Sequence, residues 1–372
     1  MSRPLKIAID ASRTTVARRT GTENYALQLI RALLALDTPH HYYLYFRDTP
    51  TVRLLPDHPR VIYRVIPWRR AWTHTRFALT LYRDRPDVTF VPSHTLPLWF
   101  PGPAVVTVHD LGYIYFPDAH PTMARFYLDR STRHSVRRAT RIIADSLATS
   151  QDLAAHYGVS ENCISLVYPG VDESLARITD PTRIAAVRAR YGLPERYLLF
   201  IGTLQPRKNI ARIVEGFTRW RADQSSPDVA LVLAGSQGWL YDPAWTAGAE
   251  QVILTGYIDD ADVAALYSGA LALVFPTLHE GFGFPVLEAM RCGTPVITSQ
   301  TSSLPEVAGE AALLVNARDA AEIAGAIDRI VTDQMLRADF IARGYQQAQQ
   351  FTWRRAAEQT LRVLEMSAQK HE

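Results

Sequence analysis

The sequence has little cysteine and no long apolar run, and each absence excludes a class of protein. Its two cysteines, Cys163 and Cys292, lie far apart and belong to no CxxC or Cys/His spacing, so neither a disulfide framework nor a zinc site is indicated. No apolar stretch approaches the roughly 18 residues that a membrane-spanning helix needs. Low-complexity tracts and repeats of a solenoid period are also missing. We expect a folded globular protein in which both cysteines are small core residues.

The first ten residues have too short an apolar stretch for a signal peptide and lead directly into an expected strand. We therefore expect the protein in the cytoplasm. With 372 residues, the chain is long enough for two domains, each with its own core. Its composition, 47% hydrophobic and 21% charged, is typical of folded domains and differs from that of disordered or fibrous chains.

Charge is distributed unevenly along the chain. Residues 1–172 carry 21 Lys and Arg against 14 Asp and Glu, whereas the remainder carries 19 against 23. Nine of the 11 histidines also lie in the first part. A basic, arginine-rich surface favours anionic ligands or an anionic membrane surface. We expect the two parts of the chain to bind different partners.

Short β-branched or aromatic runs alternate with longer amphipathic segments, which is the pattern of βα units on a parallel sheet. A break at Pro169 and Gly170 divides the runs into two series. The strands expected are residues 5–10, 42–46, 61–66, 88–91, 105–108, 142–144 and 164–167, then residues 197–201, 230–234, 252–254, 271–275, 295–298 and 312–315. The sequence thus predicts an α/β chain of two doubly wound, Rossmann-like domains, 1–172 and 173–352, facing each other across a cleft. A last helix, within about 353–372, can cap either domain and so can pack back on the first.

The most informative segment reads LHEGFGFPVLEAM and follows an expected strand. Pro285 suits the first turn of a helix, and Gly281 and Gly283 allow backbone N–H groups to approach a ligand at the helix N-terminus. Glu280 then lies on the loop and Glu288 about one turn into the helix. Two carboxylates at this position would repel phosphate, so they favour sugar hydroxyls. The alternative is that Glu280 caps the helix and Glu288 is an ordinary surface residue.

This segment resembles the E-x7-E signature of the retaining glycosyltransferases of family 4, the group 1 transferases of the two-domain GT-B fold. Further segments stand in the family's order and spacing, namely IGTLQPRKN at 201–209, LAG at 233–235, LTGY at 254–257, GTPV at 293–296 and PEV at 305–307. The resemblance implies a retaining hexosyltransferase whose second domain binds a nucleotide-sugar donor and whose first domain binds a carbohydrate or lipid-linked acceptor. For polysaccharide or glycolipid assembly, our first expectation is mannose from GDP-mannose.

The resemblance also implies roles for individual residues. Arg207 and Lys208 match the pair that neutralises the leaving diphosphate. Arginine can donate two parallel hydrogen bonds to a phosphate, and lysine contributes a point charge. The alternative for this pair is a solvated basic turn. Glu288 matches the residue that accepts hydrogen bonds from the ribose hydroxyls, and Glu280 matches the residue that faces the hexose.

In the first domain, His109 directly follows the expected strand 105–108 and matches the family's histidine that contacts the donor sugar. The alternative is a structural histidine. Asp110 is expected to orient His109 or the acceptor. Gly21 resembles a loop glycine near the donor phosphates, although the family usually has two or three glycines there, and a helix N-cap at Thr22 is the alternative. The expected substrate-binding residues are Gly21, Thr22, Asp110, Gly202, Thr203, Tyr257, Gly281, Phe282, Gly283, Phe284 and Glu288.

No metal and no cofactor are expected. The segment DDAD, from Asp259 to Asp262, contains a D-x-D string, Asp260-Ala261-Asp262, of the kind that holds a metal on the nucleotide in GT-A transferases. Here the string precedes a helical segment, which favours a helix N-cap with acidic residues in the first turn. In the GT-B fold the cationic pair and the helix termini replace the metal.

Arginine and aromatic residues alternate in WRRAWTHTRF at 68–77, a segment that includes Arg69, Arg70 and Arg76. This composition favours peripheral contact with the inner face of a membrane, or with the acceptor. The alternative is a solvated face with Trp68 and Trp72 packed inward.

Three other functions are less well supported. The first is another GT-B enzyme, an epimerase or a phosphorylase. Of these two the epimerase is kept, because a phosphorylase would need a lysine-bound cofactor and a much longer chain. An oxidoreductase would need G-x-G-x-x-G after the first strand, where the sequence reads DASR. A catalytically silent nucleotide-sugar-binding protein would be expected to lack Glu280, Lys208 or His109. No feature indicates a nucleic-acid partner.

Overall fold

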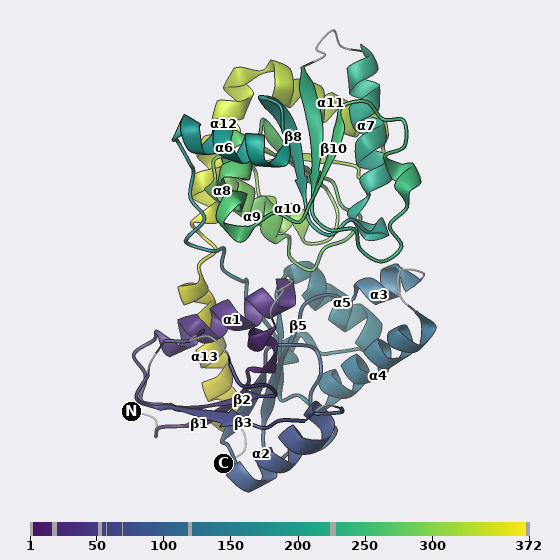
Figure 1. Cartoon of the computed structure of the whole chain (residues 1–372). Helices are drawn as coiled ribbons and strands as arrows, with labels where there is room; N and C mark the ends of the chain where they lie inside the picture. Colours follow the sequence, from purple (N-terminus) through teal and green to yellow (C-terminus); the bar gives the residue numbers. More distant parts are fainter. Residues whose placement is uncertain are drawn as a thin grey trace. The chain divides into compact units, whose positions relative to one another are not determined.

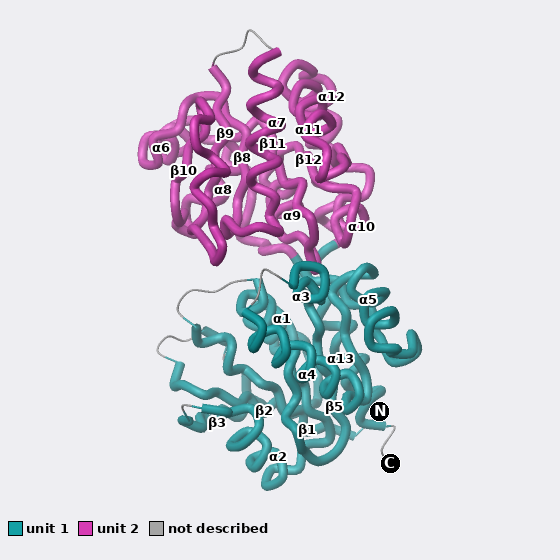
Figure 2. The backbone as a smooth tube through the Cα atoms, turned by 90° about the vertical axis from the view of Figure 1, so that its right-hand side faces the viewer, with its two compact units in different colours: residues 1–170, 351–372 teal, residues 171–350 magenta. Residues whose placement is uncertain are grey.

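The computed structural model describes residues 3–16, 21–50, 54–56, 58–68, 70–117, 121–223 and 228–369. The chain forms two compact units, coloured separately in Figure 2. Unit 1 comprises residues 1–170 and 351–372, and unit 2 comprises residues 171–350. The divisions fall two residues before the domain limits expected from the sequence.

The described part of unit 1 is built on a seven-stranded parallel sheet with the order β3-β2-β1-β4-β5-β6-β7. Its strands are β1 Lys6–Asp10, β2 His41–Phe46, β3 Val61–Val65, β4 Val88–Val91, β5 Ala104–Val108, β6 Arg141–Ala144 and β7 Ile164–Leu166. Its α-helices are α1 Gly21–Leu34, α2 Ala78–Asp84, α3 Gly112–Tyr115, α4 Thr122–Arg138, α5 Leu147–Tyr157 and α13 Trp353–Gln369. Helices thus separate most of the successive strands, as the alternating pattern predicts.

The described part of unit 2 has a six-stranded parallel sheet with the order β10-β9-β8-β11-β12-β13. Its strands are β8 Arg196–Ile201, β9 Val229–Ala234, β10 Val252–Gly256, β11 Ala272–Phe275, β12 Val296–Ser299 and β13 Leu313–Val315. Its α-helices are α6 Pro181–Tyr191, α7 Ile210–Asp223, α8 Asp260–Gly269, α9 Phe284–Arg291, α10 Leu304–Ala308, α11 Ala320–Thr332 and α12 Gln334–Ala348. Figure 1 shows these helices on both sides of the sheet.

Both sheets reverse their strand order at one place, between β1 and β4 in unit 1 and between β8 and β11 in unit 2. Chains of this topology bind ligands outside the carboxyl ends of the strands at the reversal. The expected fold class, two doubly wound α/β units, is confirmed.

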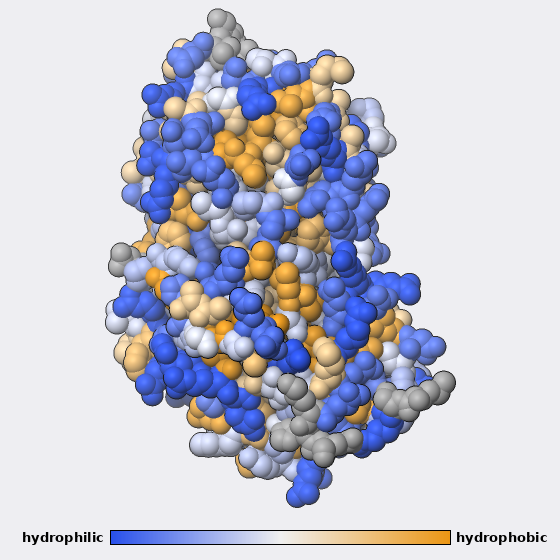
Figure 3. Space-filling view, turned by 180° about the vertical axis from the view of Figure 1, so that it is seen from behind, coloured by the Kyte–Doolittle hydropathy of each residue, from blue (hydrophilic) through white to orange (hydrophobic). Residues whose placement is uncertain are grey.

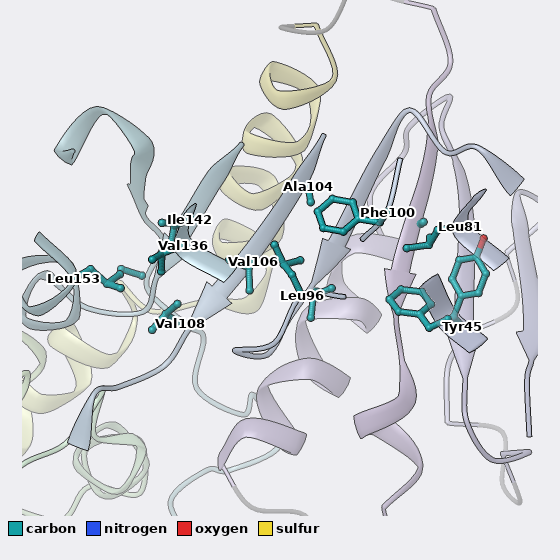
Figure 4. Packing of buried hydrophobic residues seen from close by; sticks show 14 of the residues in the cluster. Tyr45, Leu81, Leu96, Phe100, Ala104, Val106, Val108, Val136, Ile142 and Leu153 are labelled. Atoms are coloured by element: carbon teal, nitrogen blue, oxygen red, sulfur yellow. The ribbon is translucent and has the colours of Figure 1, made fainter. Parts of the chain in front are cut away.

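Every expected strand is present, and its ends differ from the expected ones by at most two residues. The reason is burial, because strands such as β4, β5, β9 and β11 are buried along their whole length and therefore have continuous apolar sequences. Figure 4 shows part of the unit 1 core, in which Val106 and Val108 of β5 lie beside Ile142 of β6 and Val136 of α4.

The last helix, α13, belongs to unit 1 and packs on α1. The rings of Trp353 and Tyr25 are 5.8 Å apart. The backbone N–H of Leu5 donates to His40 Nδ1 (3.1 Å), so the opposite nitrogen, Nε2, donates to Glu365 Oε1 (3.0 Å). The backbone at Gly170 lies so close to the start of α13 that a Cβ on Gly170 would be 2.1 Å from the backbone nitrogen of Trp353.

One expectation about side-chain burial needs correction, and the alternative of two inward-packed tryptophans holds for one of them. Cys163 is exposed, because it lies in a short 3-10 turn before the edge strand β7, whereas Cys292 is buried as expected. Trp72 is buried, stacks on Phe77 and donates from Nε1 to the Ile66 oxygen (2.9 Å). Trp68 is 45% exposed instead of packed inward.

Hydrophilic and hydrophobic residues are interspersed over the face of the molecule in Figure 3. None of the helices in the described residues is long and apolar enough to cross a membrane.

Candidate active site

Arg207 and Lys208 lie in a 3-10 turn, Pro206–Lys208, that follows β8 at the carboxyl edge of the unit 2 sheet. The turn ends at Asn209, whose φ of 62° is left-handed. Its side-chain amide donates to the backbone oxygens of Pro276 (2.9 Å) and Ala317 (2.6 Å). Asn209 therefore ties the basic turn to the segment that follows β11.

The basic turn and the glutamate loop come together at Glu280. Lys208 Nζ donates to Glu280 Oε1 (2.6 Å), and Arg207 Nη1 lies 3.3 Å from Glu280 Oε2. Arg207 Nη1 also donates to the backbone oxygen of His279 (2.9 Å). Two cations share one carboxylate, so the cluster keeps an excess positive charge. The structure therefore excludes a solvated basic turn, since both Lys208 and Glu280 are more than 90% buried.

Burial alone would raise the pKa of Glu280, but the charges of Lys208 and then Arg207 outweigh it and hold the pKa below its usual value. The carboxylate is therefore ionised at neutral pH. A fixed ionised group on this loop can stabilise positive charge or accept hydrogen bonds from hydroxyls.

Serine side chains fix the loop that carries Glu280. The backbone N–H of Glu280 donates to Ser302 Oγ (3.1 Å), while Ser303 Oγ donates to the backbone oxygens of Glu280 (3.0 Å) and Phe282 (2.7 Å). Gly283 precedes α9 with a φ of 109°, and a Cβ there would lie 2.6 Å from Leu304 Cδ2. The expected order of glycine loop, proline and helix is confirmed, because α9 begins at Phe284 with Pro285 in its first turn.

Glu288 lies on α9, as expected, and is partly buried. Tyr267 donates its hydroxyl to Glu288 Oε2 (2.9 Å). Burial raises the pKa of Glu288 to about 7; the Tyr267 hydrogen bond opposes this shift, and the charges of Asp172 and Asp260 add to it. Its ionisation therefore changes near neutral pH.

Two glycines bring neighbouring strand ends close together. Gly202, after β8, donates its N–H to the Ala234 oxygen (2.9 Å), and Gly235, after β9, donates to the Gly256 oxygen (2.8 Å). A Cβ on Gly235 would lie 2.1 Å from the Gly202 oxygen. Thr203 and Tyr257 are exposed at the same edge.

The remaining expected residues of the glutamate loop line its entry into α9. Gly281 and Phe282 are buried and Phe284 is partly buried, with the Phe282 and Phe284 rings 5.1 Å apart. The structure thus brings Arg207, Lys208 and the loop residues together at one sheet edge.

In unit 1, His109 follows β5 at the carboxyl edge and is buried. Its Nδ1 lies 2.5 Å from Asp145 Oδ2 and its Nε2 lies 3.1 Å from the Pro92 oxygen. Both partners are acceptors, an arrangement that favours hydrogen on both ring nitrogens and thus the imidazolium form. Burial lowers the pKa of His109, but the Asp145 carboxylate outweighs it and the net shift is upward.

Sequence reasoning missed Asp145 and expected Asp110 to orient His109. Asp110 Oδ1 instead accepts from the Gly112 N–H (2.9 Å) at the start of α3. Asp145 could have been found, since β5 and β6 are adjacent parallel strands with Val108 opposite Ala144, so the residues that follow them are neighbours.

The loop before α1 is only partly described, because Arg19 and Thr20 lie outside the described residues. The helix begins at Gly21, so Thr22 lies in its first turn and is not the N-cap. Glu23 pairs with Arg13 at 3.4 Å.

Asp260 and Asp262 lie in the first turn of α8, as expected, whereas Asp259 occupies the N-cap position without a side-chain cap hydrogen bond. Arg190 forms ion pairs with Asp259 and with Asp262, the latter at 2.7 Å. Asp260 accepts from the Tyr257 hydroxyl (3.3 Å).

Two family models match the chain. The model described as glycosyl transferases group 1 covers residues 185–347, and the model described as Glycosyltransferase Family 4 covers residues 19–175. The first match contains Arg207, Lys208, Glu280 and Glu288, and the second contains His109.

Curated relatives also match. O-antigen chain mannosyltransferase B of Escherichia coli is 32% identical over 322 residues, which are 82% of this chain and 79% of the relative. Serotype-specific mannosyltransferase WbdA of Escherichia coli is 30% identical over 275 residues, 69% of this chain, and the match spans 32% of that protein. The solved structure of HepE from Anabaena in complex with UDP-glucose has a TM-score of 0.73 at 18% identity, covering 97% of this chain and 99% of that one. At that identity the likeness concerns the fold.

Proposed function

The chain belongs to the group 1 glycosyltransferases of the GT-B fold, and from that premise we propose that it transfers mannose from GDP-mannose with retention of anomeric configuration. It is a glycosyltransferase, and its relatives place it in polysaccharide synthesis. The names of both relatives support mannose as the sugar, and the UDP-glucose complex of HepE supports a nucleotide sugar as the donor.

The observation that carries the proposal is the cluster of Arg207, Lys208 and Glu280. A departing nucleoside diphosphate gains negative charge, and a fixed cation pair with excess positive charge stabilises it without reorganisation. Because both cations are already held by Glu280, they are preorganised before the donor binds. Glu280 faces the hexose in this proposal and stabilises positive charge at the anomeric carbon.

The same cluster supports catalysis without a metal. A divalent cation in a glycosyltransferase site neutralises the diphosphate, and here two protein cations can do so. The Asp259 and Asp262 carboxylates are paired with Arg190. We expect activity to survive excess EDTA, and full loss with rescue by magnesium would contradict this part of the proposal.

Glu288 accepts hydrogen bonds from the ribose hydroxyls in this proposal, and the first unit binds a carbohydrate or lipid-linked acceptor. The position of Glu288 on α9, beside the loop that carries Glu280, supports this division between nucleotide and sugar. The acceptor oxygen attacks on the face of the sugar that the diphosphate leaves, which gives retention.

We also propose that unit 1 contacts an anionic membrane surface through the exposed face of α4. Met123, Phe126 and Tyr127 are 77%, 59% and 54% exposed, and Arg130 follows on the same face one turn later. Tyr127 lies 3.3 Å from His74 Nε2, so this face adjoins the basic, aromatic segment. Arg69 of that segment lies outside the described residues. Apolar side chains next to arginines are typical of helices that lie in a membrane interface.

Vesicle sedimentation tests the membrane contact. Binding to vesicles with acidic lipid should be salt-sensitive and should weaken in the Phe126→Ser/Arg130→Gln double variant. The exposed Arg354→Gln variant on α13 is the control. Equal binding to neutral vesicles would contradict the proposal.

The donor is tested by a thermal-shift panel of nucleotide sugars. A donor at 100 times its dissociation constant should add about 2.7 kcal/mol of stability. GDP-mannose should give the largest shift, and a larger shift with a UDP-sugar would overturn the choice of donor. Binding without transfer to any acceptor would favour the silent binding protein.

A further inference from the structure

His94 is a histidine at the carboxyl edge of the unit 1 sheet that the proposed mechanism does not use. It follows β4, whose neighbour in the sheet is β5, the strand that His109 follows. Its side chain is partly buried. Its Nε2 lies 2.9 Å from the backbone oxygen of Asp110. A carbonyl oxygen can only accept, so Nε2 carries the hydrogen.

The opposite nitrogen of this ring is open. Among the residues that the structure describes, none forms a hydrogen bond with His94 Nδ1. In a neutral imidazole whose hydrogen is on Nε2, Nδ1 holds a lone pair and accepts hydrogen bonds. His109 differs, because Asp145 and the Pro92 oxygen occupy both of its nitrogens.

The charged neighbours favour neutral His94. Its ring is 5.7 Å from that of His109, whose two acceptor partners favour the imidazolium form. Burial lowers the pKa of His94 and the charge of His109 lowers it further, whereas Asp110 and Asp145 oppose the shift. Two adjacent histidines thus differ in charge, and only the neutral one has a nitrogen available to a ligand.

We propose that His94 is a sugar-binding residue, whose Nδ1 accepts a hydrogen bond from a ligand hydroxyl at the carboxyl edge of unit 1. Asp145 acts on His94 in two opposite ways, since it favours the charged form of His109, whose charge lowers the pKa of His94, while its own charge raises that pKa. The inference rests on the proposed glycosyl transfer and adds a residue to it. Acceptor and donor sugars both carry hydroxyls, and the two are separated by experiment.

Two substitutions isolate the nitrogen. His94→Asn retains an acceptor oxygen near the position of Nδ1 and cannot titrate, whereas His94→Leu removes the acceptor. His134→Leu is the matched control, because His134 is also partly buried and its Nε2 also bonds a backbone oxygen, that of Pro97 (3.1 Å), but it lies on the helix α4. Circular dichroism and melting temperature establish that each variant is folded.

Initial rates are measured with GDP-mannose and octyl α-mannoside. His94→Leu should raise one KM by about tenfold, the cost of one lost hydrogen bond, and His94→Asn should recover most of it. A change in the KM for octyl α-mannoside assigns the hydroxyl to the acceptor, and a change in the KM for GDP-mannose assigns it to the donor. Changes below twofold in both, or an equal change in His134→Leu, would overturn the proposal.

The pH dependence and the ring itself give independent readouts. The affected KM should rise as the pH falls through the pKa of His94 and should be flat in His94→Asn. Nitrogen NMR of the wild type should show an unprotonated Nδ1 at pH 7 that shifts on addition of one of the two sugars. A protonated Nδ1, or no shift with either, would overturn the inference. Absence of transfer by the wild type would instead contradict the proposed function, and the NMR titration would still decide the role of His94.

Discussion

Glu280 shares its two carboxylate oxygens between Lys208 and Arg207, so these three side chains act as one unit. Their separation in the sequence, more than 70 residues, explains why spacing alone did not predict the contact. The motifs predicted that each residue belongs to the site. The ion pairs form because β8 and β11 are adjacent strands of the sheet, a pairing that the spacing of the motifs does not contain.

Removal of either cation should impair catalysis. Arg207→Ala and Lys208→Ala should each lower kcat by about 100-fold, by analogy with the loss of one donor to a developing anion. Arg212→Ala is the control, because Arg212 lies on the next helix, α7, and its guanidinium forms an exposed pair with Glu215 at 3.1 Å. The measurement is the steady-state kcat of each variant, made on protein whose circular dichroism spectrum matches that of the wild type. Near-normal turnover in both site variants would contradict the role of the pair.

The two glutamates should differ in nucleotide binding. Glu288, with its pKa raised to about 7, should bind the ribose hydroxyls better when ionised, so affinity for GDP should increase as the pH rises through 7. Glu288→Gln should weaken GDP binding by about 1 to 3 kcal/mol and flatten this dependence. Glu280→Gln should leave the pH dependence of GDP binding in place while it depresses turnover, and it should change GDP affinity only through the cation pair that Glu280 holds. Calorimetric titration at pH 6 and 8 measures both, and the opposite assignment of the losses would show that the roles are reversed.

At the scale of elements, the sequence predicted where the strands lie better than it predicted which side chains are buried or in contact. Continuous apolar runs identify buried parallel strands, and proline and glycine identify the start of α9. Side-chain burial at edges was harder to predict, as Cys163 shows, because it lies in the short 3-10 turn before the edge strand β7 and not in the strand itself. Asp145 was missed for another reason, since only the pairing of β5 with β6 places it beside His109.

The glycine turns after β8 and β9 should be sensitive to a single methyl group. Gly235→Ala should destabilise the protein by about 2 kcal/mol or more, because a Cβ would lie 2.1 Å from the Gly202 oxygen at a φ of 141°. Gly325→Ala on α11 is the matched control, because its Cβ meets nothing within 4 Å. It should be neutral or stabilising by about 0.5 to 1 kcal/mol. Urea unfolding compares the two, and equal stabilities would refute the close approach.

At the scale of the whole molecule, the chain divides its chemistry between two units of the same topology. Unit 1 carries the excess of arginine, the adjacent histidines His94 and His109 and the exposed face of α4, whereas unit 2 carries the cation pair and both glutamates. The division into two series of strands was predictable from the break at Pro169 and Gly170. The unit to which α13 belongs was not, since helical spacing does not identify the surface that the helix covers.

The central claim is mannosyl transfer with retention, and the configuration of the first product tests it most directly. Proton and carbon NMR should follow the reaction of GDP-mannose, whose sugar is α-linked, with octyl α-mannoside from its first minutes. The account predicts an α-linked disaccharide that forms in step with GDP, and forms about 100-fold more slowly with Lys208→Ala. A β-linked product would contradict retention, and transfer from a different nucleotide sugar in place of GDP-mannose would contradict the assignment of the donor.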